Sequence, residues 1–228
     1  YPLQNVSWVI GNVVFPAFSK IQHDLEKVRN SYMKMTRAIS FVTFPLMTSL
    51  FVVAPEFVTV VYGVKWEPVI ILMRILCVCG LIQSVGTTVG NLFLSQGRSD
   101  ILLRLGVIGA FVAMGAVTIG LKWGINGVAI CYTIQALFWT HIVFIVANRL
   151  INLEYGRFYS VLRKPYILGC LTLVVLFSSK IILNLMSYSP FLNLVVMVLI
   201  SVFTYFIFLF VTNEVVRKNG TFVINILR

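Results

Sequence analysis

Charged side chains are scarce in this 228-residue sequence. They make up 11% of the chain, whereas 59% of its residues are hydrophobic. An ordinary soluble domain carries about 25% charged residues. The apolar residues also gather in runs of about twenty or more, long enough to cross about 30 Å of hydrocarbon as helices. The scarcity of charge therefore excludes an ordinary soluble domain and indicates a membrane protein that crosses the bilayer several times.

Groups that carry enzyme chemistry are also few. The chain has seven acidic residues and two histidines, and only Glu56, Glu67 and His141 fall near membrane depth, scattered along the sequence. Hydrolytic and metal sites need acids, bases or ligands that converge. The one close cysteine pair, Cys77 and Cys79, is spaced so that its thiols point to different faces of a helix. We expect no enzyme, no metal site and no cofactor.

Turn-forming stretches divide the chain into hydrophobic spans. The predicted helices cover 1–19, 37–61, 67–95, 101–121, 125–147, 166–186 and 191–212. The fold class is therefore all-α, a polytopic helical membrane protein with six full transmembrane helices and a partial one. The long segments 20–36 and 148–165 are expected to be cytoplasmic loops that form at most helices lying on the membrane. Because the chain starts at Tyr1 without an initiator Met or a signal peptide, we expect it to be a fragment of a longer protein.

Lysine and arginine alternate between the two sides of the predicted spans. Fourteen of the 18 lie in alternate loops and in the C-terminal segment, whereas the opposite side carries only Lys65, Lys122 and Lys180. Since cytoplasmic loops are enriched in Lys and Arg, the basic loops and the C-terminus are predicted to be cytoplasmic. The net charge of +11 then reflects topology and contact with membrane lipids, not nucleic-acid binding.

Polar residues within the spans are candidate ligands for a substrate, because hydrocarbon offers them no partner. Gln4, Asn5 and Asn12 lie on a polar flank of the first helix, and Gln83 lies within the span 67–95. Such residues either line a water-filled cavity or bond between helices.

Small residues and prolines predict local features of these spans. Gly86 and Gly90 have the small-xxx-small spacing that lets helices pack closely. Pro45 and Pro55 each remove a backbone donor from the span 37–61 and favour a kink.

Arg74 is the one basic residue that topology does not explain. It lies nine residues before Gln83, which places the two about 180° apart on a helix. It also lies about 12 Å inward of Trp66, a predicted interfacial anchor. Either its guanidinium reaches an aqueous cavity and binds an anion, or it snorkels outward and pairs with Glu56.

Three stretches of the sequence are similar to a known family. They are "VVFPAFSKIQHDLEKVRNSYMKMTRAISFVTFPLMTSLFVVAPEFVTVVYGVKWEP", "GNLFLSQGRSDILLRLG" and "WGINGVAICYTI". In their order and spacing they resemble the bacterial polysaccharide exporters, lipid-linked oligosaccharide flippases of the multidrug/oligosaccharidyl-lipid/polysaccharide superfamily. The resemblance runs from about residue 10 to 150.

The resemblance implies a transporter of two six-helix lobes, like the multidrug exporters of the superfamily. Residues 1–147 would belong to its C-terminal lobe, and 148–228 would form a cytoplasmic linker, an extra helix pair and a basic tail. Such exporters carry undecaprenyl-pyrophosphate-linked sugars from the cytoplasmic to the periplasmic leaflet of the bacterial inner membrane. The implied partners are that lipid-linked oligosaccharide, membrane lipids, and the polysaccharide polymerase and chain-length machinery. Arg74 is the candidate pyrophosphate ligand, and Gln83, Gln4, Asn5 and Asn12 are candidate sugar ligands.

Three other functions stay open at this point. An integral membrane polymerase or acyltransferase would act on the same lipid-linked sugars, although the outward loops are short for a polymerase. A cation-coupled drug antiporter of the same superfamily would use a membrane carboxylate, for which Glu56 is the candidate. A scaffold that binds partners in the membrane is the third.

The topology can be tested with reporter fusions. Alkaline phosphatase, which is active outside the cytoplasm, should be active when fused after Lys122 and inactive after Gly97, and green fluorescent protein should give the reverse result. The same activity at both points would contradict the predicted alternation of loops.

Overall fold

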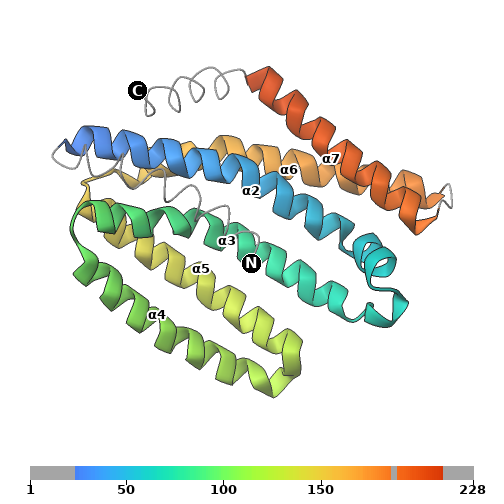
Figure 1. The fold of residues 1–228 in the computed structure, drawn as a ribbon, viewed down its shortest axis with the longest axis horizontal. Helices are drawn as coiled ribbons and strands as arrows, with labels where there is room; N and C mark the ends of the chain where they lie inside the picture. The colour runs from blue at the N-terminus through green and yellow to red at the C-terminus, as the bar shows by residue number, and fades with distance from the viewer. Residues whose placement is uncertain (1–23, 186–188, 213–228) are drawn as a thin grey trace.

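The computed structural model describes residues 24–185 and 189–212. This part of the chain contains the following α-helices (Figure 1): α2 (Leu25–Val61), α3 (Val69–Ser95), α4 (Ser99–Gly120), α5 (Gly124–Leu150), α6 (Tyr155–Leu185) and α7 (Pro190–Thr212). Two short 3-10 turns, η1 (Val64–Trp66) and η2 (Leu121–Trp123), lie in the connections. The predicted all-α class is confirmed.

Five stretches of the described residues are long and apolar enough to cross a membrane. One of them, Ser99–Leu150, contains both α4 and α5. The chain turns at Gly124, whose φ of +70° is unfavourable for other residues, and Figure 1 shows the two helices side by side. The structure therefore agrees with a polytopic bundle, while the count of six spans stays a prediction. The predicted first helix, 1–19, lies outside the described residues.

The segment 20–36, expected to be a loop that forms at most a helix lying on the membrane, is helical from Leu25 onward and continuous with the span that follows it. Asp24 caps the helix by accepting hydrogen bonds from the backbone N–H groups of Glu26 and Lys27, both at 3.1 Å. The bond from Lys27 lowers the pKa of the Asp24 carboxyl. Val28 and Tyr32, one helical turn apart, are fully buried. This first part of α2 therefore packs against the rest of the bundle through one face.

The second long loop, expected at 148–165, is also largely helical. α6 begins at Tyr155 and continues through Pro165 as one helix. Phe158 and Leu168, on either side of that proline, are both fully buried. Burial of apolar residues therefore extends this helix beyond the span that hydropathy predicts.

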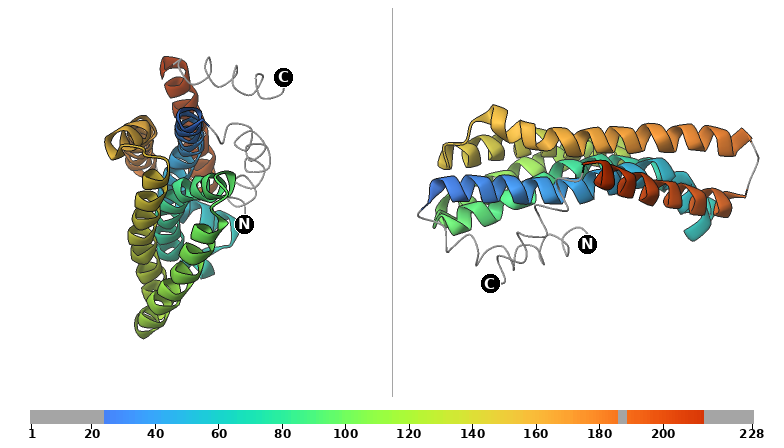
Figure 2. Two further views of the ribbon diagram at one scale, coloured as in Figure 1. Left: turned by 90° about the vertical axis from the view of Figure 1, so that its left-hand side faces the viewer. Right: turned by 90° about the horizontal axis from the view of Figure 1, so that it is seen from above.

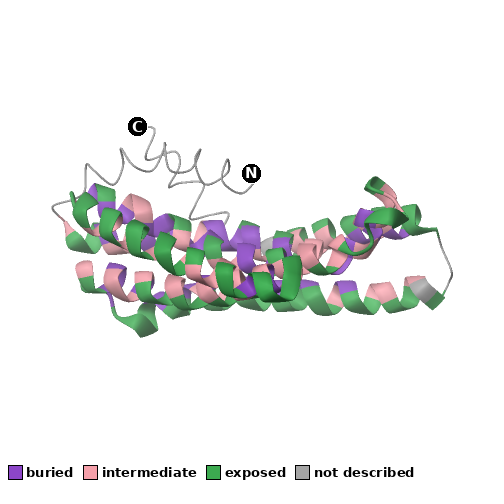
Figure 3. Ribbon diagram, turned by 90° about the horizontal axis from the view of Figure 1, so that it is seen from below, coloured by how far each residue is buried: buried purple, intermediate pink, exposed green. Residues whose placement is uncertain are grey.

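α2 is the central helix of the described bundle. It packs against α3, α6 and α7, while α3 also packs against α5, and α5 against α4. Figure 2 shows α6 running alongside α2, and Figure 1 shows α4 at one edge, beside α5. Exposed residues occur along the whole bundle (Figure 3), as expected where outer helix faces meet lipid or further protein.

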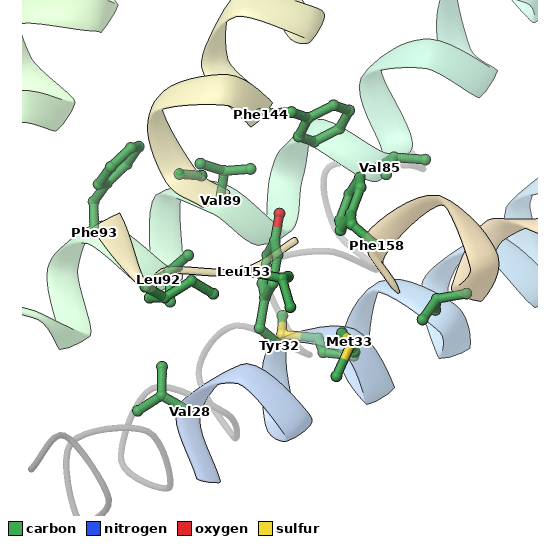
Figure 4. Close-up of a cluster of buried hydrophobic side chains, with 14 of the residues drawn as sticks. Val28, Tyr32, Met33, Val85, Val89, Leu92, Phe93, Phe144, Leu153 and Phe158 are labelled. Atoms are coloured by element: carbon green, nitrogen blue, oxygen red, sulfur yellow. The ribbon is translucent and has the colours of Figure 1, made fainter. Parts of the chain in front are cut away.

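The main hydrophobic core lies at the end where α2 and α6 begin and where α3 and α5 finish. Figure 4 shows Tyr32 and Phe158 at its centre. Their rings stack with centroids 5.7 Å apart, and Phe144 lies 5.1 Å from Phe158. At the other end a smaller cluster holds Val52 and Leu176. Side-chain packing is therefore concentrated at the end that carries the basic loops.

Close backbone approach occurs at glycines other than those predicted. A Cβ on Gly86 would make ordinary contact with Thr140 at 3.6 Å, and one on Gly90 would meet none of the described atoms within 4 Å. In contrast, a Cβ on Gly120 would lie 2.5 Å from the Val128 Cα, and one on Gly127 would lie 2.6 Å from the Gly120 carbonyl oxygen. Among the described glycines, the close contact with backbone atoms is therefore at the turn between α4 and α5.

Gly120→Ala should destabilise the protein by about 1–3 kcal/mol, because its methyl group would collide with the backbone of α5. Gly115→Ala on the same helix is the matched control, since a Cβ there meets no described atom within 4 Å. Thermal unfolding in detergent should show a lower midpoint for the first variant and an unchanged or higher one for the second. Equal midpoints for both variants would contradict the close contact.

Candidate functional site

Gln83 lies near the middle of α3 and its side chain is exposed in the described bundle. Its amide Nε2 donates a hydrogen bond to the Tyr132 hydroxyl of α5, with 3.0 Å between the two atoms. Both residues line a hollow of about 360 Å³ between α3, α4 and α5, which we call the polar pocket. Its lining residues are Gln83, Gly86, Thr87, Gly109, Ala113, Tyr132, Gln135, Ala136, Trp139, Thr140 and Val143.

Trp139 occupies space that a glycine of the neighbouring helix leaves open. A Cβ on Gly109 of α4 would lie 2.7 Å from the indole Nε1 of Trp139. The missing side chain thus lets a large aromatic ring of α5 lie against α4. Tyr132, Gln135 and Trp139 lie on one face of α5 because they are spaced i, i+3 and i+7.

The depth of the polar pocket makes its chemistry informative. Gln83, Thr87 and Gln135 lie well inside their helices, and a polar side chain at such depth is costly if it faces lipid. This face should therefore meet water or further protein. Two amides, a phenol and an indole supply hydrogen-bond donors, acceptors and a flat apolar surface. Such a set can bind an uncharged polyhydroxylated molecule.

Arg74 lies on another face of α3, against α2. Its Nε donates to the backbone carbonyl of Phe51 at 3.3 Å, and its guanidinium carbon lies 5.6 Å from the centroid of the Phe51 ring. The side chain is half-buried. Arg74 and Gln83 therefore face different neighbouring helices, as their nine-residue separation predicts.

Glu56 is paired with a lysine of α6. The Lys180 Nζ lies 2.7 Å from Glu56 Oε1 and 3.0 Å from Oε2, and the two side chains are 18% and 10% exposed, respectively. The sequence-based alternative that paired Arg74 with Glu56 is therefore corrected, because Glu56 bonds to Lys180 and Arg74 to Phe51. Removing two opposite charges from water is tolerated when they neutralise each other.

The structure describes only some of the predicted site residues. Gln4, Asn5 and Asn12 lie outside the described residues, and Arg74 and Gln83 are not brought together. Tyr132, Gln135 and Trp139 were not predicted, although their spacing on one helix face was a usable signal. Lys180, predicted to lie in an outward loop, lies within α6.

The sequence is similar to proteins of polysaccharide biosynthesis. Residues 1–71 match a family described as polysaccharide biosynthesis protein. The chain is 32% identical over 185 residues to the lipopolysaccharide biosynthesis protein WzxC of Escherichia coli (strain K12), which covers 80% of this chain and 38% of that protein. It is 30% identical over 141 residues to an uncharacterized membrane protein in the cps region of Klebsiella pneumoniae, covering 60% of this chain and 29% of that one.

A third relative matches a shorter part of the chain. The chain is 28% identical over 100 residues to the teichuronic acid biosynthesis protein TuaB of Bacillus subtilis (strain 168), covering 44% of this chain and 21% of that protein. The chain thus spans well under half the length of each of these three relatives.

Glu56→Gln should destabilise the bundle by about 3 kcal/mol, because it leaves the Lys180 ammonium without its carboxylate in a largely buried place. The double variant Glu56→Gln/Lys180→Met should recover most of this loss, since it removes both charges. Thermal unfolding of the single and double variants in one detergent measures the coupling. Additive losses would contradict an ion pair that acts as a unit.

Proposed function

The chain belongs to the polysaccharide biosynthesis protein family, and from that membership we propose that the full-length protein exports lipid-linked glycan across the bacterial inner membrane. The proposed substrate is an undecaprenyl-pyrophosphate-linked oligosaccharide or polysaccharide repeat unit, which moves from the cytoplasmic to the periplasmic leaflet. In this proposal the protein is a transporter and not an enzyme.

The observation that carries the proposal is the polar pocket at mid-depth. Sugar hydroxyls need both donors and acceptors, which the Gln83 and Gln135 amides and the Tyr132 hydroxyl offer within one hollow. The Trp139 ring offers an apolar surface on which a sugar face can lie. Polar groups this far inside their helices need another helix, water or a ligand as partner. Gln83 and Tyr132 bond to each other across two helices, and each keeps capacity for a further bond to a sugar hydroxyl.

The proposal extends to the domains and to the polar residues near the start of the chain. Residues 1–147 would form part of a C-terminal lobe, and 148–228 would add a helix pair with a cytoplasmic C-terminus. Gln4, Asn5 and Asn12 would line the same path as the polar pocket. The pyrophosphate contact predicted for Arg74 is not part of this proposal, because its side chain bonds to α2 and does not line the polar pocket.

One observation weighs against the cation-coupled drug antiporter. Such a transporter needs a membrane carboxylate that is available to a coupling ion or a cationic drug. Glu56 already has Lys180 on both of its carboxylate oxygens. The pair makes Glu56 a connection between α2 and α6 and not an open cation site.

The proposal is tested in a strain that lacks this exporter and carries the full-length gene. Gln83→Leu and Trp139→Leu should each lower surface polysaccharide about tenfold, because losing about 1.4 kcal/mol of substrate binding is a factor of ten. Lipid-linked repeat units should accumulate on the cytoplasmic side. Phe138→Leu is the matched control: Phe138 is the neighbour of Trp139, is 67% exposed and is not among the lining residues of the polar pocket.

Two results would contradict this function. Normal surface polysaccharide in the strain without the protein, together with sensitivity to drugs, would favour the antiporter. Lipid-linked units that reach the periplasmic face but are not joined or acylated would favour the membrane enzyme.

A further inference from the structure

α2 contains a gap in its backbone hydrogen bonding. Pro55 lies inside the helix and has no N–H, so the carbonyl of Phe51, four residues earlier, cannot receive its usual helical bond. The bilayer core offers no water to replace that bond. In a membrane helix the Phe51 carbonyl therefore needs a donor from another side chain or helix.

Arg74 of α3 supplies this donor. Its Nε lies 3.3 Å from the Phe51 carbonyl oxygen, and the guanidinium also lies over the Phe51 ring. The donor thus reaches the one carbonyl whose helical partner Pro55 removes. This accounts for a positive charge within a span that topology does not explain.

A second cation, from α6, reaches the next carbonyl of α2. The Lys180 Nζ of α6 lies 3.4 Å from the Val52 carbonyl oxygen while it pairs with Glu56. Thr59 donates to the carbonyls of Pro55 and Glu56 at 2.9 and 3.1 Å. Side chains of α2, α3 and α6 therefore gather at one point of the α2 backbone.

We propose that Arg74 is a positioning residue that completes the backbone hydrogen bonding of α2 at Pro55. Arg74 replaces the missing backbone donor, and Lys180 fixes the following turn to α6 through Val52 and Glu56. Together they fix the short last part of α2, up to Val61, relative to α3 and α6. This role requires a hydrogen-bond donor at position 74 and makes no use of the exported substrate.

Substitutions at position 74 separate this role from a pyrophosphate contact. The amide Nε2 of a glutamine occupies the same place along the side chain as the Nε of arginine, so Arg74→Gln keeps a donor and loses the charge. Arg74→Met has similar length and loses both. In the full-length protein we expect Arg74→Gln to stay within about twofold of native export and close to the native unfolding midpoint. Arg74→Met should lose about tenfold in export and unfold at a lower temperature.

Equal and severe loss of export in both variants, with unchanged unfolding midpoints, would overturn the proposal and favour the pyrophosphate contact. The unfolding midpoints do not depend on the exported molecule. They therefore test the structural role of Arg74 even if the protein carries a different substrate.

A proline background provides the second test. In Pro55→Ala, residue 55 regains an N–H for the Phe51 carbonyl, so adding Arg74→Met should shift the unfolding midpoint far less than it does in the native protein. Pro45→Ala is the matched control. Pro45 also lies inside α2, but the carbonyl that it leaves without a helical donor is that of Phe41, not that of Phe51. In that background Arg74→Met should keep its full effect. The same shift in all three backgrounds would overturn the proposal.

Discussion

A backbone carbonyl in hydrocarbon has no water to bond with, and this constraint governs how α2 is built. α2 is the central helix and includes two prolines, each of which removes a backbone donor. Near Pro55 the neighbouring helices contribute Arg74 and Lys180 to the affected part of the backbone. Burying a polar side chain in a membrane costs free energy, but here the side chain can donate a hydrogen bond to a backbone carbonyl that lacks its helical donor.

The two ends of the bundle are held by different interactions. At the end with the basic loops, aromatic rings around Phe158 pack tightly and α2 begins with an ordinary polar cap. At the opposite end the hydrophobic cluster is small, and the Glu56–Lys180 pair connects α2 to α6. Between these ends, the polar pocket opens on the side of α3 that faces away from Arg74. One helix therefore separates a structural cation from the groups proposed to meet the substrate.

Much of the helix pattern is predictable from the sequence. The limits of α3, α4, α5 and α7 lie within three residues of those expected, since glycine and proline punctuate apolar runs. The early parts of α2 and α6 are not predicted, because their charged residues resemble those of a loop. Val28 and Tyr32, one helical turn apart and both buried, show that such a segment can be a helix with one buried face and one charged face.

The candidate site is predictable only in part. Gln83 stands out because an amide in an apolar run needs a hydrogen-bond partner. That Arg74 points away from Gln83 follows from their nine-residue separation on one helix. Glu56 and Lys180 are 124 residues apart, so their pairing depends on how α2 and α6 are placed, which no local pattern contains. The donation from Arg74 to Phe51 likewise depends on which two helices become neighbours.

The bond between Arg74 and the Phe51 carbonyl also has a consequence for sequence change over evolution. A proline at position 55 makes a donor at position 74 valuable, and any residue with an N–H at position 55 removes that need. The two positions, on different helices and 19 residues apart, are therefore expected to change together in related sequences. Exchange of the proline should come before exchange of the arginine, because the opposite order passes through a protein whose central helix has an unsatisfied carbonyl.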